Sequence, residues 1–337
     1  VRAGTDYQNE KVEVKRAYHS INYREGRYQV SNLYRQETNA DFLLFARKDI
    51  SEDFTLSGSF GGNIMNNQYT NQRSTVEKLV VPDVYSLSNA KETPTTYYYQ
   101  TQKEIQSLYA MISAEWRGQI FLDLTGRNDW SSTLPADNNS YFYPSVTASW
   151  IFTETFGMDP GVFTFGKLRL GLAQVGNDTD PYRLNATYNS SNPYGNNPLY
   201  SLTNTMPPLN LVNELITSQE LGLDLRFFQS RLGIDFTYYK SVAKNQILSA
   251  VVSSTSGYNS QTINAGQVDN NGIEIMLSGT PVARGDFSWD IMLNWSKNNS
   301  KIVSLNGDIE RLELYKTEGN QITVVADVGG ASVSYTH

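Results

Sequence analysis

Cysteine is absent from the 337 residues of this chain, and histidine occurs only as His19 and His337. Without cysteine, the chain has no disulfide framework and no thiolate metal site. The GxSxG motif of serine hydrolases and the HExxH motif of zinc peptidases are also missing. We therefore expect a protein that is not an enzyme, with no catalytic residue, no cofactor and no metal ligand.

Long hydrophobic runs are missing as well. No stretch of 18 or more apolar residues occurs, which excludes a transmembrane helix. The start of the chain, 1–4, does not show the pattern of a signal peptide, a basic start followed by an apolar core. An excess of positive charge is also lacking, because the net charge is -7, and this argues against a nucleic-acid partner.

In several segments of the chain, apolar and polar side chains instead alternate with a period of two residues. In segment 231–239 the apolar positions are Leu232, Ile234, Phe236 and Tyr238. In segment 220–227 they are Leu221, Leu223, Leu225 and Phe227. Successive side chains of a strand point to opposite faces, so each segment is predicted to be a strand with one apolar and one polar face.

A sheet of such strands has two common architectures. A sandwich buries its apolar face against a second sheet. A transmembrane barrel turns the apolar face to lipid and the polar face to its lumen. The mean hydropathy of -0.44 does not separate them, because half of each barrel strand also faces water.

The pattern predicts about eleven strands and connections of two lengths. The strands are expected at 27–35, 40–48, 53–61, 105–116, 119–127, 143–153, 164–175, 217–228, 231–249, 262–280 and 286–303. Short turns at 49–53, 117–118, 229–230 and 281–285 alternate with long polar connections at 63–104, 129–142, 176–216 and 251–261. Outer-membrane barrels have this asymmetry, with short periplasmic turns and long extracellular loops.

Several longer stretches carry a family resemblance. They are FLDLTGRNDWSSTLP at 121–135, LAQVGNDTDPYRL at 172–184, QELGLDLRFFQSRLGIDFTYYK at 219–240 and NAGQVDNNGIEIMLSGTP at 264–281. With these blocks the chain resembles the SusC/RagA family of TonB-linked outer-membrane proteins of Bacteroidetes-type bacteria.

The resemblance implies an all-β, antiparallel transmembrane barrel of 22 strands, of which residues 1–337 would form about half within a single barrel domain. A plug and an N-terminal accessory domain are expected to be absent from this chain. The family's function implies TonB-dependent uptake of oligosaccharides or peptides across the bacterial outer membrane. The implied partners are a SusD-like surface lipoprotein, TonB acting through the missing N-terminal region, membrane lipid, and a second transporter–lipoprotein pair.

Two sets of residues are candidates for function. Aromatic side chains expected on outer loops are candidates for contact with substrate or lipoprotein: Tyr97, Tyr98, Tyr99, Trp130 and Tyr141. Packing or an interfacial aromatic girdle is the alternative for these. Charged side chains on the polar face are candidates for the lumen or plug: Lys167, Arg169, Glu220, Asp224, Arg226, Asp235, Glu274 and Asp290. Cross-strand pairing on a wetted face is their alternative.

Two other functional classes stay open at this point. A secreted β-sandwich adhesin or glycan-binding protein would use the same alternation, and a β-rich glycan hydrolase would use the plentiful carboxylates. Segment 177–180, with its Asn and Asp residues, suggests calcium only loosely, since a turn before Pro181 explains the composition more simply.

Overall fold

The computed structural model describes residues 1–337 apart from 159–160, 196, 306–308, 317–322, 332–333 and 337. The main strands are β1 (Arg2–Ser20), β2 (Tyr23–Asp49), β3 (Phe54–Val76), β4 (Thr95–Trp116), β5 (Ile120–Ser131), β6 (Ser140–Ile151), β7 (Phe163–Asn177), β11 (Glu214–Phe227), β12 (Leu232–Val251), β13 (Ser260–Arg284) and β14 (Phe287–Ser304). These strands are joined to one another by antiparallel pairing, which confirms the predicted all-β, antiparallel fold.

The smaller elements lie in the connections and near the C-terminus. They are β8 (Tyr188–Tyr194), β9 (Asn197–Leu202), β10 (Thr205–Met206), β15 (Arg311–Lys316), β16 (Thr323–Asp327), β17 (Ser334–Thr336), the helix α1 (Phe152–Thr155) and the 3-10 turns η1 (Leu87–Asn89) and η2 (Ser254–Ser256). Among the described residues, no helix combines the length and the apolar character needed to span a bilayer.

The chain divides into two compact units. Unit 1 comprises Val1–Phe42, Gly62–Gln106 and Asp180–Tyr182, and unit 2 comprises Leu43–Gly61, Ser107–Thr179 and Arg183–His337. Strands β2, β3 and β4 each contribute one segment to each unit.

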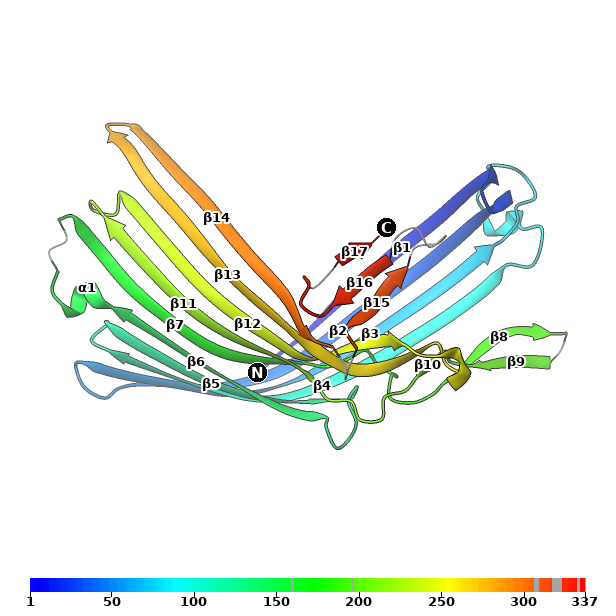
Figure 1. The fold of residues 1–337 in the computed structure, drawn as a ribbon, viewed down its shortest axis with the longest axis horizontal. Helices are drawn as coiled ribbons and strands as arrows, with labels where there is room; N and C mark the ends of the chain where they lie inside the picture. Colours follow the sequence, from blue (N-terminus) through cyan, green and yellow to red (C-terminus); the bar gives the residue numbers. More distant parts are fainter. Residues whose placement is uncertain (159–160, 196, 306–308, 317–322, 332–333, 337) are drawn as a thin grey trace. The chain divides into compact units, whose positions relative to one another are not determined.

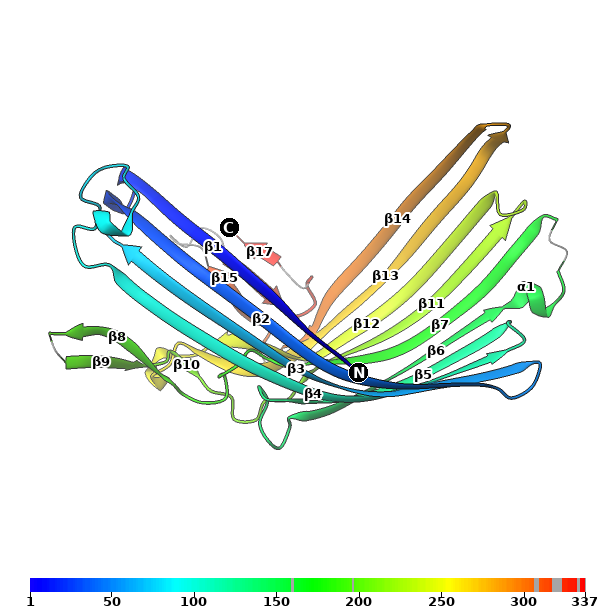
Figure 2. The same ribbon diagram turned by 180° about the vertical axis from the view of Figure 1, so that it is seen from behind.

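Unit 1 contains β1 and segments of β2, β3 and β4 in that order. Strands β1 and β2 lie side by side (Figure 2) and pair from Arg2 with Asp41 to Ser20 with Tyr23. A small core forms where Tyr28, Val76 and Leu79 pack together. Side chains on both faces of β1 are polar: Gln8 and Glu10 on one face, Asn9 and Lys11 on the other.

Unit 2 contains the rest of the sheet. Its order runs from β2 through β7 to β11, β12 and β13, with β14 paired to β13, and the last strands lie side by side in Figure 1. Strand β10 adds a short parallel pairing to β13. The strand that follows β7 in the sheet is β11, so the β8–β9 hairpin of the connection 178–213 lies outside the sheet, whereas β10 of the same connection pairs with β13.

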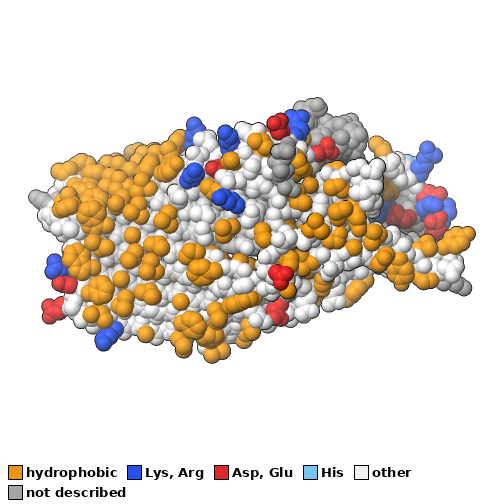
Figure 3. All heavy atoms as spheres, turned by 60° about the horizontal axis from the view of Figure 1, so that its bottom comes forward, with side chains coloured by type: hydrophobic (Ala, Val, Ile, Leu, Met, Phe, Trp, Pro, Cys, Tyr) orange, Lys and Arg blue, Asp and Glu red, His pale blue; other side chains and the backbone are white. Residues whose placement is uncertain are grey.

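On the apolar face of unit 2, apolar residues of seven neighbouring strands are paired directly with one another. Through the pairing register, one row joins Ile120, Trp150, Leu168, Leu223, Phe236, Ile275 and Trp295. This face lies open: Leu172 is 55% exposed, Leu293 60% and Trp295 54%. Figure 3 shows hydrophobic side chains spread over the face in view, with few charged ones among them. No second sheet buries this face in the part of the chain that the structure describes, as a sandwich would require.

The apolar band crosses the strands obliquely. On β5 its middle is Leu122, which the register connects to Tyr238 of β12. On β14 its middle is Ile291, which the register connects to Leu232 of β12. The band therefore shifts by about six residues over six strand-to-strand steps, from 238 to 232. With the usual rise per residue and strand spacing, one residue per strand is a tilt of roughly 35°.

Several predicted boundaries were wrong. Segments 27–35 and 40–48 belong to one strand, β2, and β1 was not predicted. Most of the connection predicted at 63–104 is strand, since β3 continues to Val76 and β4 begins at Thr95. The connection predicted at 176–216 contains β8, β9 and β10. The segments that were missed in unit 1 are polar on both faces, so they lack the alternation by which strands were sought.

Candidate functional site

The eight charged residues predicted for the polar face do share one face of unit 2. Direct pairing places Lys167 opposite Asp224 and Asp224 opposite Asp235. Two residues away on the same face, the next row of direct partners is Arg169 of β7, Gly222 of β11, Thr237 of β12 and Glu274 of β13. Directly paired residues lie on the same side of a sheet, and alternation along each strand adds the remaining members of the set, Glu220, Arg226 and Asp290.

Arg169 and Asp235 form the central ion pair of this face. Arg169 Nη1 and Nη2 each donate a hydrogen bond of 2.9 Å to the Asp235 carboxylate, a bidentate arrangement. The two residues sit on β7 and β12, with β11 between them. Gly222 of β11 makes the crossing possible, because a Cβ at that position would lie 2.7 Å from Arg169 Nε. The absence of a side chain at Gly222 thus leaves space for the guanidinium.

A second polar cluster joins β4, β5 and β6. Arg127 Nε donates to Asp129 Oδ1 at 2.8 Å, and Arg127 Nη2 donates to Ser107 Oγ at 2.9 Å. The Tyr143 hydroxyl donates to Asp129 Oδ2 at 2.5 Å. Asp129 is buried, so these donors compensate the cost of removing its charge from water.

Asp178 connects the GRNDWSSTLP and QVGNDTDPYR blocks. The Ser131 hydroxyl donates to its carboxylate, and Thr133 Oγ1 donates to Asp178 Oδ2 at 3.1 Å. All three residues are buried. The composition of 177–180 is therefore explained by a structural anchor at the end of β7. Within the described residues, no cluster of three or more acidic or histidine side chains is placed to hold a metal ion.

The far end of the connection 178–213 is anchored as well. Asn264 donates to Val212 O at 2.8 Å and accepts from Val212 N at 2.9 Å. Asn138 donates to Leu211 O at 3.2 Å. The Leu211 side chain is fully buried against Leu134 and Tyr141. Both ends of this long connection are thus fixed to the sheet of unit 2, by what we call the loop anchor: Ser131, Thr133, Asn138, Asp178, Leu211 and Asn264.

The loop placement predicted for Trp130 and Tyr141 was wrong. Trp130 lies in β5 and Tyr141 lies in β6. Trp130 is partnered with Ser140 and shares the face of Leu124, so it belongs to the apolar side. Tyr141 is only 7% exposed and packs over Gly176, where a Cβ would meet its ring at 2.5 Å. The burial of Tyr141 makes it part of the loop anchor's surroundings instead of an open surface.

Tyr97, Tyr98 and Tyr99 also lie in a strand, β4, and not in a loop as predicted. The rings of Tyr97 and Tyr99 are stacked with centroids 6.3 Å apart. Tyr98 points to the opposite face, because neighbouring side chains of a strand alternate. The three tyrosines therefore do not form one surface, although all three remain exposed.

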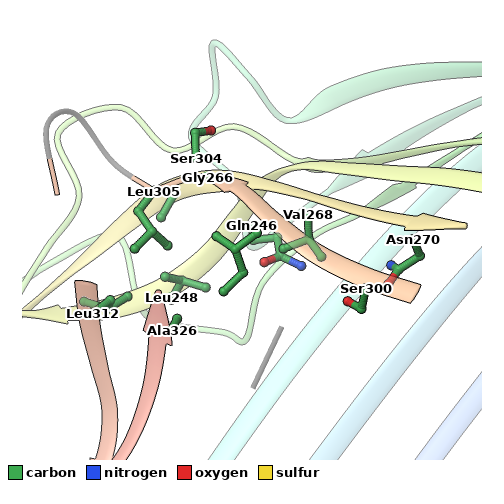
Figure 4. Close-up of a pocket in the computed structure, with 12 residues that line it drawn as sticks. Gln246, Leu248, Gly266, Val268, Asn270, Ser300, Ser304, Leu305, Leu312 and Ala326 are labelled. Atoms are coloured by element: carbon green, nitrogen blue, oxygen red, sulfur yellow. The ribbon is translucent and has the colours of Figure 1, made fainter. Parts of the chain in front are cut away.

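A cavity of about 300 Å³ lies on the polar face of β13 and β14 in unit 2. Figure 4 shows Val268 and Asn270 from β13 and Ser300 from β14 along one side, with Leu312 of β15 and Ala326 of β16 on the other. Ile302, Leu312 and Ala326 form a small hydrophobic cluster with Ala250 there. Sequence alternation did not indicate this cavity, because β15 and β16 were not among the predicted strands.

Comparison with known proteins identifies relatives along nearly the whole chain. The family model described as "TonB dependent receptor-like, beta-barrel" matches residues 1–336. TonB-dependent receptor P26 of Formosa agariphila is 32% identical over 214 residues, which cover 60% of this chain and 21% of the relative. TonB-dependent receptor SusC of Bacteroides thetaiotaomicron is 29% identical over 237 residues, which cover 67% of this chain and 23% of the relative.

The fold also matches a solved structure. The RagAB peptide transporter superposes with a TM-score of 0.81 at 18% identity, over 97% of this chain and 36% of that chain. At this identity the match shows a shared fold. The chain thus spans between about a fifth and a third of the length of these relatives.

Proposed function

Because this chain belongs to the TonB dependent receptor-like, β-barrel family, we propose that it is part of a SusC/RagA-type importer. This importer takes up oligosaccharides or peptides across the outer membrane with energy delivered through TonB. Residues 1–337 are a portion of one barrel domain in this proposal, and the plug and the segment that meets TonB belong to the remainder of a longer protein. The chain has no enzymatic role in it.

The observation that carries the proposal is the contrast between the two faces of unit 2. One face is an open apolar band that crosses seven strands at a tilt close to that of outer-membrane barrels. The other is wetted and charged, with Arg169 and Asp235 paired across an intervening strand. Lipid satisfies the first face, and a water-filled lumen or a plug satisfies the second.

The partners follow from the relatives. SusC and the RagAB peptide transporter support a two-component importer, in which a SusD-like surface lipoprotein captures substrate above the barrel. The charged face of unit 2 would then meet the plug or the passing substrate. Two such transporter–lipoprotein pairs would form the complete assembly.

The proposal is tested on the full-length protein in its native membrane. Cells with the gene, without it, and with the gene but without TonB are incubated with labelled oligosaccharides and with labelled peptides, and depletion of each from the medium is measured. Depletion that needs both the gene and TonB is expected for one of the two substrate classes. Uptake that is unchanged without TonB would contradict the proposal.

A second measurement tests the partner. Native mass spectrometry of the detergent-extracted complex, with peptide sequencing of each component, is expected to show a parent chain far heavier than 37.9 kDa together with a lipoprotein. A free species of 37.9 kDa that stays soluble without detergent would contradict both the partner and the barrel.

A further inference from the structure

Five side chains of unit 1 form a continuous series of stacked contacts. Arg35 of β2 lies 5.5 Å from the ring centre of Tyr69 on β3, and Tyr69 meets Tyr99 of β4 at 6.4 Å. Tyr99 stacks on Tyr97, and Arg73 of β3 lies 4.7 Å from the Tyr97 ring centre. We call this series the guanidinium–tyrosine ladder. Each contact is short enough for a cation–π or aromatic interaction.

The ladder occupies one face of the sheet in unit 1. Tyr97 and Tyr99 are two residues apart, and Tyr69 and Arg73 are four apart, so each pair shares a face. The same face carries carboxamides: Asn67 Nδ2 donates to Glu37 Oε2 at 3.3 Å, and Asn39 Nδ2 donates to Glu37 Oε1 at 2.9 Å. Aromatic rings, guanidiniums, amides and the Glu37 carboxylate that holds two of these amides are therefore gathered on one polar surface.

The two arginines of the ladder differ from most cations of unit 1. Arg2, Arg27 and Lys78 are paired with Asp41, Glu77 and Glu92. Among the described residues, neither Arg35 nor Arg73 has a carboxylate partner, and their contacts are with tyrosine rings. A ring covers the flat face of a guanidinium and leaves its in-plane N–H donors available. Two such groups at the ends of an aromatic stack form a receptor for anionic groups.

The ladder is open to a ligand. Tyr97 is 45% exposed and Tyr99 41% exposed. Strand segments of unit 1 carry polar side chains on both faces, as at Gln100 and Thr101 of β4, so these segments suit water and not lipid. Tyrosine rings also lose little conformational entropy when they bind a ligand, because they have only two side-chain torsions.

We propose that the guanidinium–tyrosine ladder binds an acidic oligosaccharide, one whose sugars carry carboxylate or sulfate groups. This assignment rests on the proposed importer function and names the substrate class for it. The C–H face of a sugar ring packs on the tyrosines, the hydroxyls bond to the amides and phenols, and the acidic groups bond to Arg35 and Arg73. The flat tyrosine faces at the centre of the ladder match the C–H face of a sugar ring, which is why the proposal names a sugar.

The test measures binding by the purified full-length protein in detergent, without TonB. The probes are dextran sulfate, unsulfated dextran of the same chain length, and hexaglutamate. Arg35→Gln and Arg73→Gln are each expected to weaken dextran sulfate binding about tenfold, since each removes charge-assisted hydrogen bonds. Arg24→Gln is the matched control, because Arg24 is also exposed in unit 1 but has no ring contact among the described residues. Thermal unfolding of each variant checks that it folds.

Each outcome decides the proposal. Tighter binding of dextran sulfate than of dextran, lost in the two variants and kept in Arg24→Gln, supports it. Equal binding of the two dextrans, no binding of dextran sulfate, or variants that bind like the wild type would overturn it. If hexaglutamate binds as tightly as dextran sulfate, the assignment of the ligand as a sugar is overturned and an acidic peptide is favoured. Because this assay involves no transport, its failure is separate from a failure of TonB-dependent uptake.

Discussion

At the scale of single residues, Asp178 holds together two segments far apart in sequence. Its carboxylate accepts from Ser131 and Thr133, which are 47 and 45 residues away. Both hydroxyls are buried, so neither has water as a replacement partner. These contacts give the two blocks a structural task in this chain, the fixing of the connection 178–213.

Replacement of Asp178 by Ala is expected to destabilise the protein by about 1–3 kcal/mol, because two buried hydroxyls lose their acceptor. Chemical unfolding of the full-length protein in detergent measures the loss, and hydrogen exchange should rise in 178–213. Asp137→Ala is the control, since Asp137 is exposed in the same region. Equal stability of the two variants would contradict the anchoring role.

The polar-face residues could be predicted from the sequence, whereas the partner of Asp178 could not. Arg169 and Asp235 each alternate with leucine, isoleucine or phenylalanine, so their face follows from strand geometry alone. The contact of Asp178 with Ser131 depends on β6 lying between β5 and β7 and on the course of the chain after β5 and β7 end. Local alternation does not contain that information. The bidentate pairing across Gly222 likewise depends on the register of three strands.

At the scale of elements, β14 has one apolar face and one face that is polar apart from Met292 between Phe287 and Trp295. Phe287, Trp289, Leu293 and Trp295 are all more than half exposed on its apolar side. Asn294 and Ser296 alternate with them on the polar side. Such exposure would be costly in water and is favourable in lipid.

The substitution Leu293→Arg is expected to cost about 2–4 kcal/mol in a bilayer, with the upper value at the midplane. Asn294→Arg, on the next residue and the opposite face, is expected to cost far less. Both residues are exposed in the structure, so the pair separates contact with lipid from packing within the protein. Unfolding of the two variants in lipid vesicles gives the comparison, and equal costs would refute the assignment of the apolar face to lipid.

Elements were predicted well only where the two faces differ. Strands β7 and β11 to β14 lie close to their expected positions, because leucine and isoleucine alternate there with charged or small residues. Strand β1 and the unit 1 segments of β3 and β4 are polar on both sides, so no two-residue contrast marks them as strands. The loop placement predicted for Tyr97 was wrong because its segment of β4 lacks this contrast. Tertiary pairing, and not local amphipathicity, makes these segments extended.

At the scale of the whole molecule, the oblique apolar band of unit 2 predicts how its strands stand in the membrane. A shift of about one residue per strand corresponds to a tilt of roughly 35° from the bilayer normal. Polarised infrared spectroscopy of the full-length protein in oriented bilayers measures this angle from the amide I dichroism. Strands that lie without preferred orientation would contradict a transmembrane sheet.

The long excursion between β7 and β11 also determines how the sheet of unit 2 is assembled. Strands β11 and β12 meet after closing a connection of four residues, Phe228–Arg231, whereas β7 and β11 must close one of 36 residues, 178–213. The chain entropy of the longer closure adds about 2 kcal/mol to the barrier. We therefore expect the hairpins on either side to form before β7 pairs with β11. The loop anchor at Asp178 and Asn264 would then stabilise the pairing of β7 with β11 after the two sets of hairpins have met.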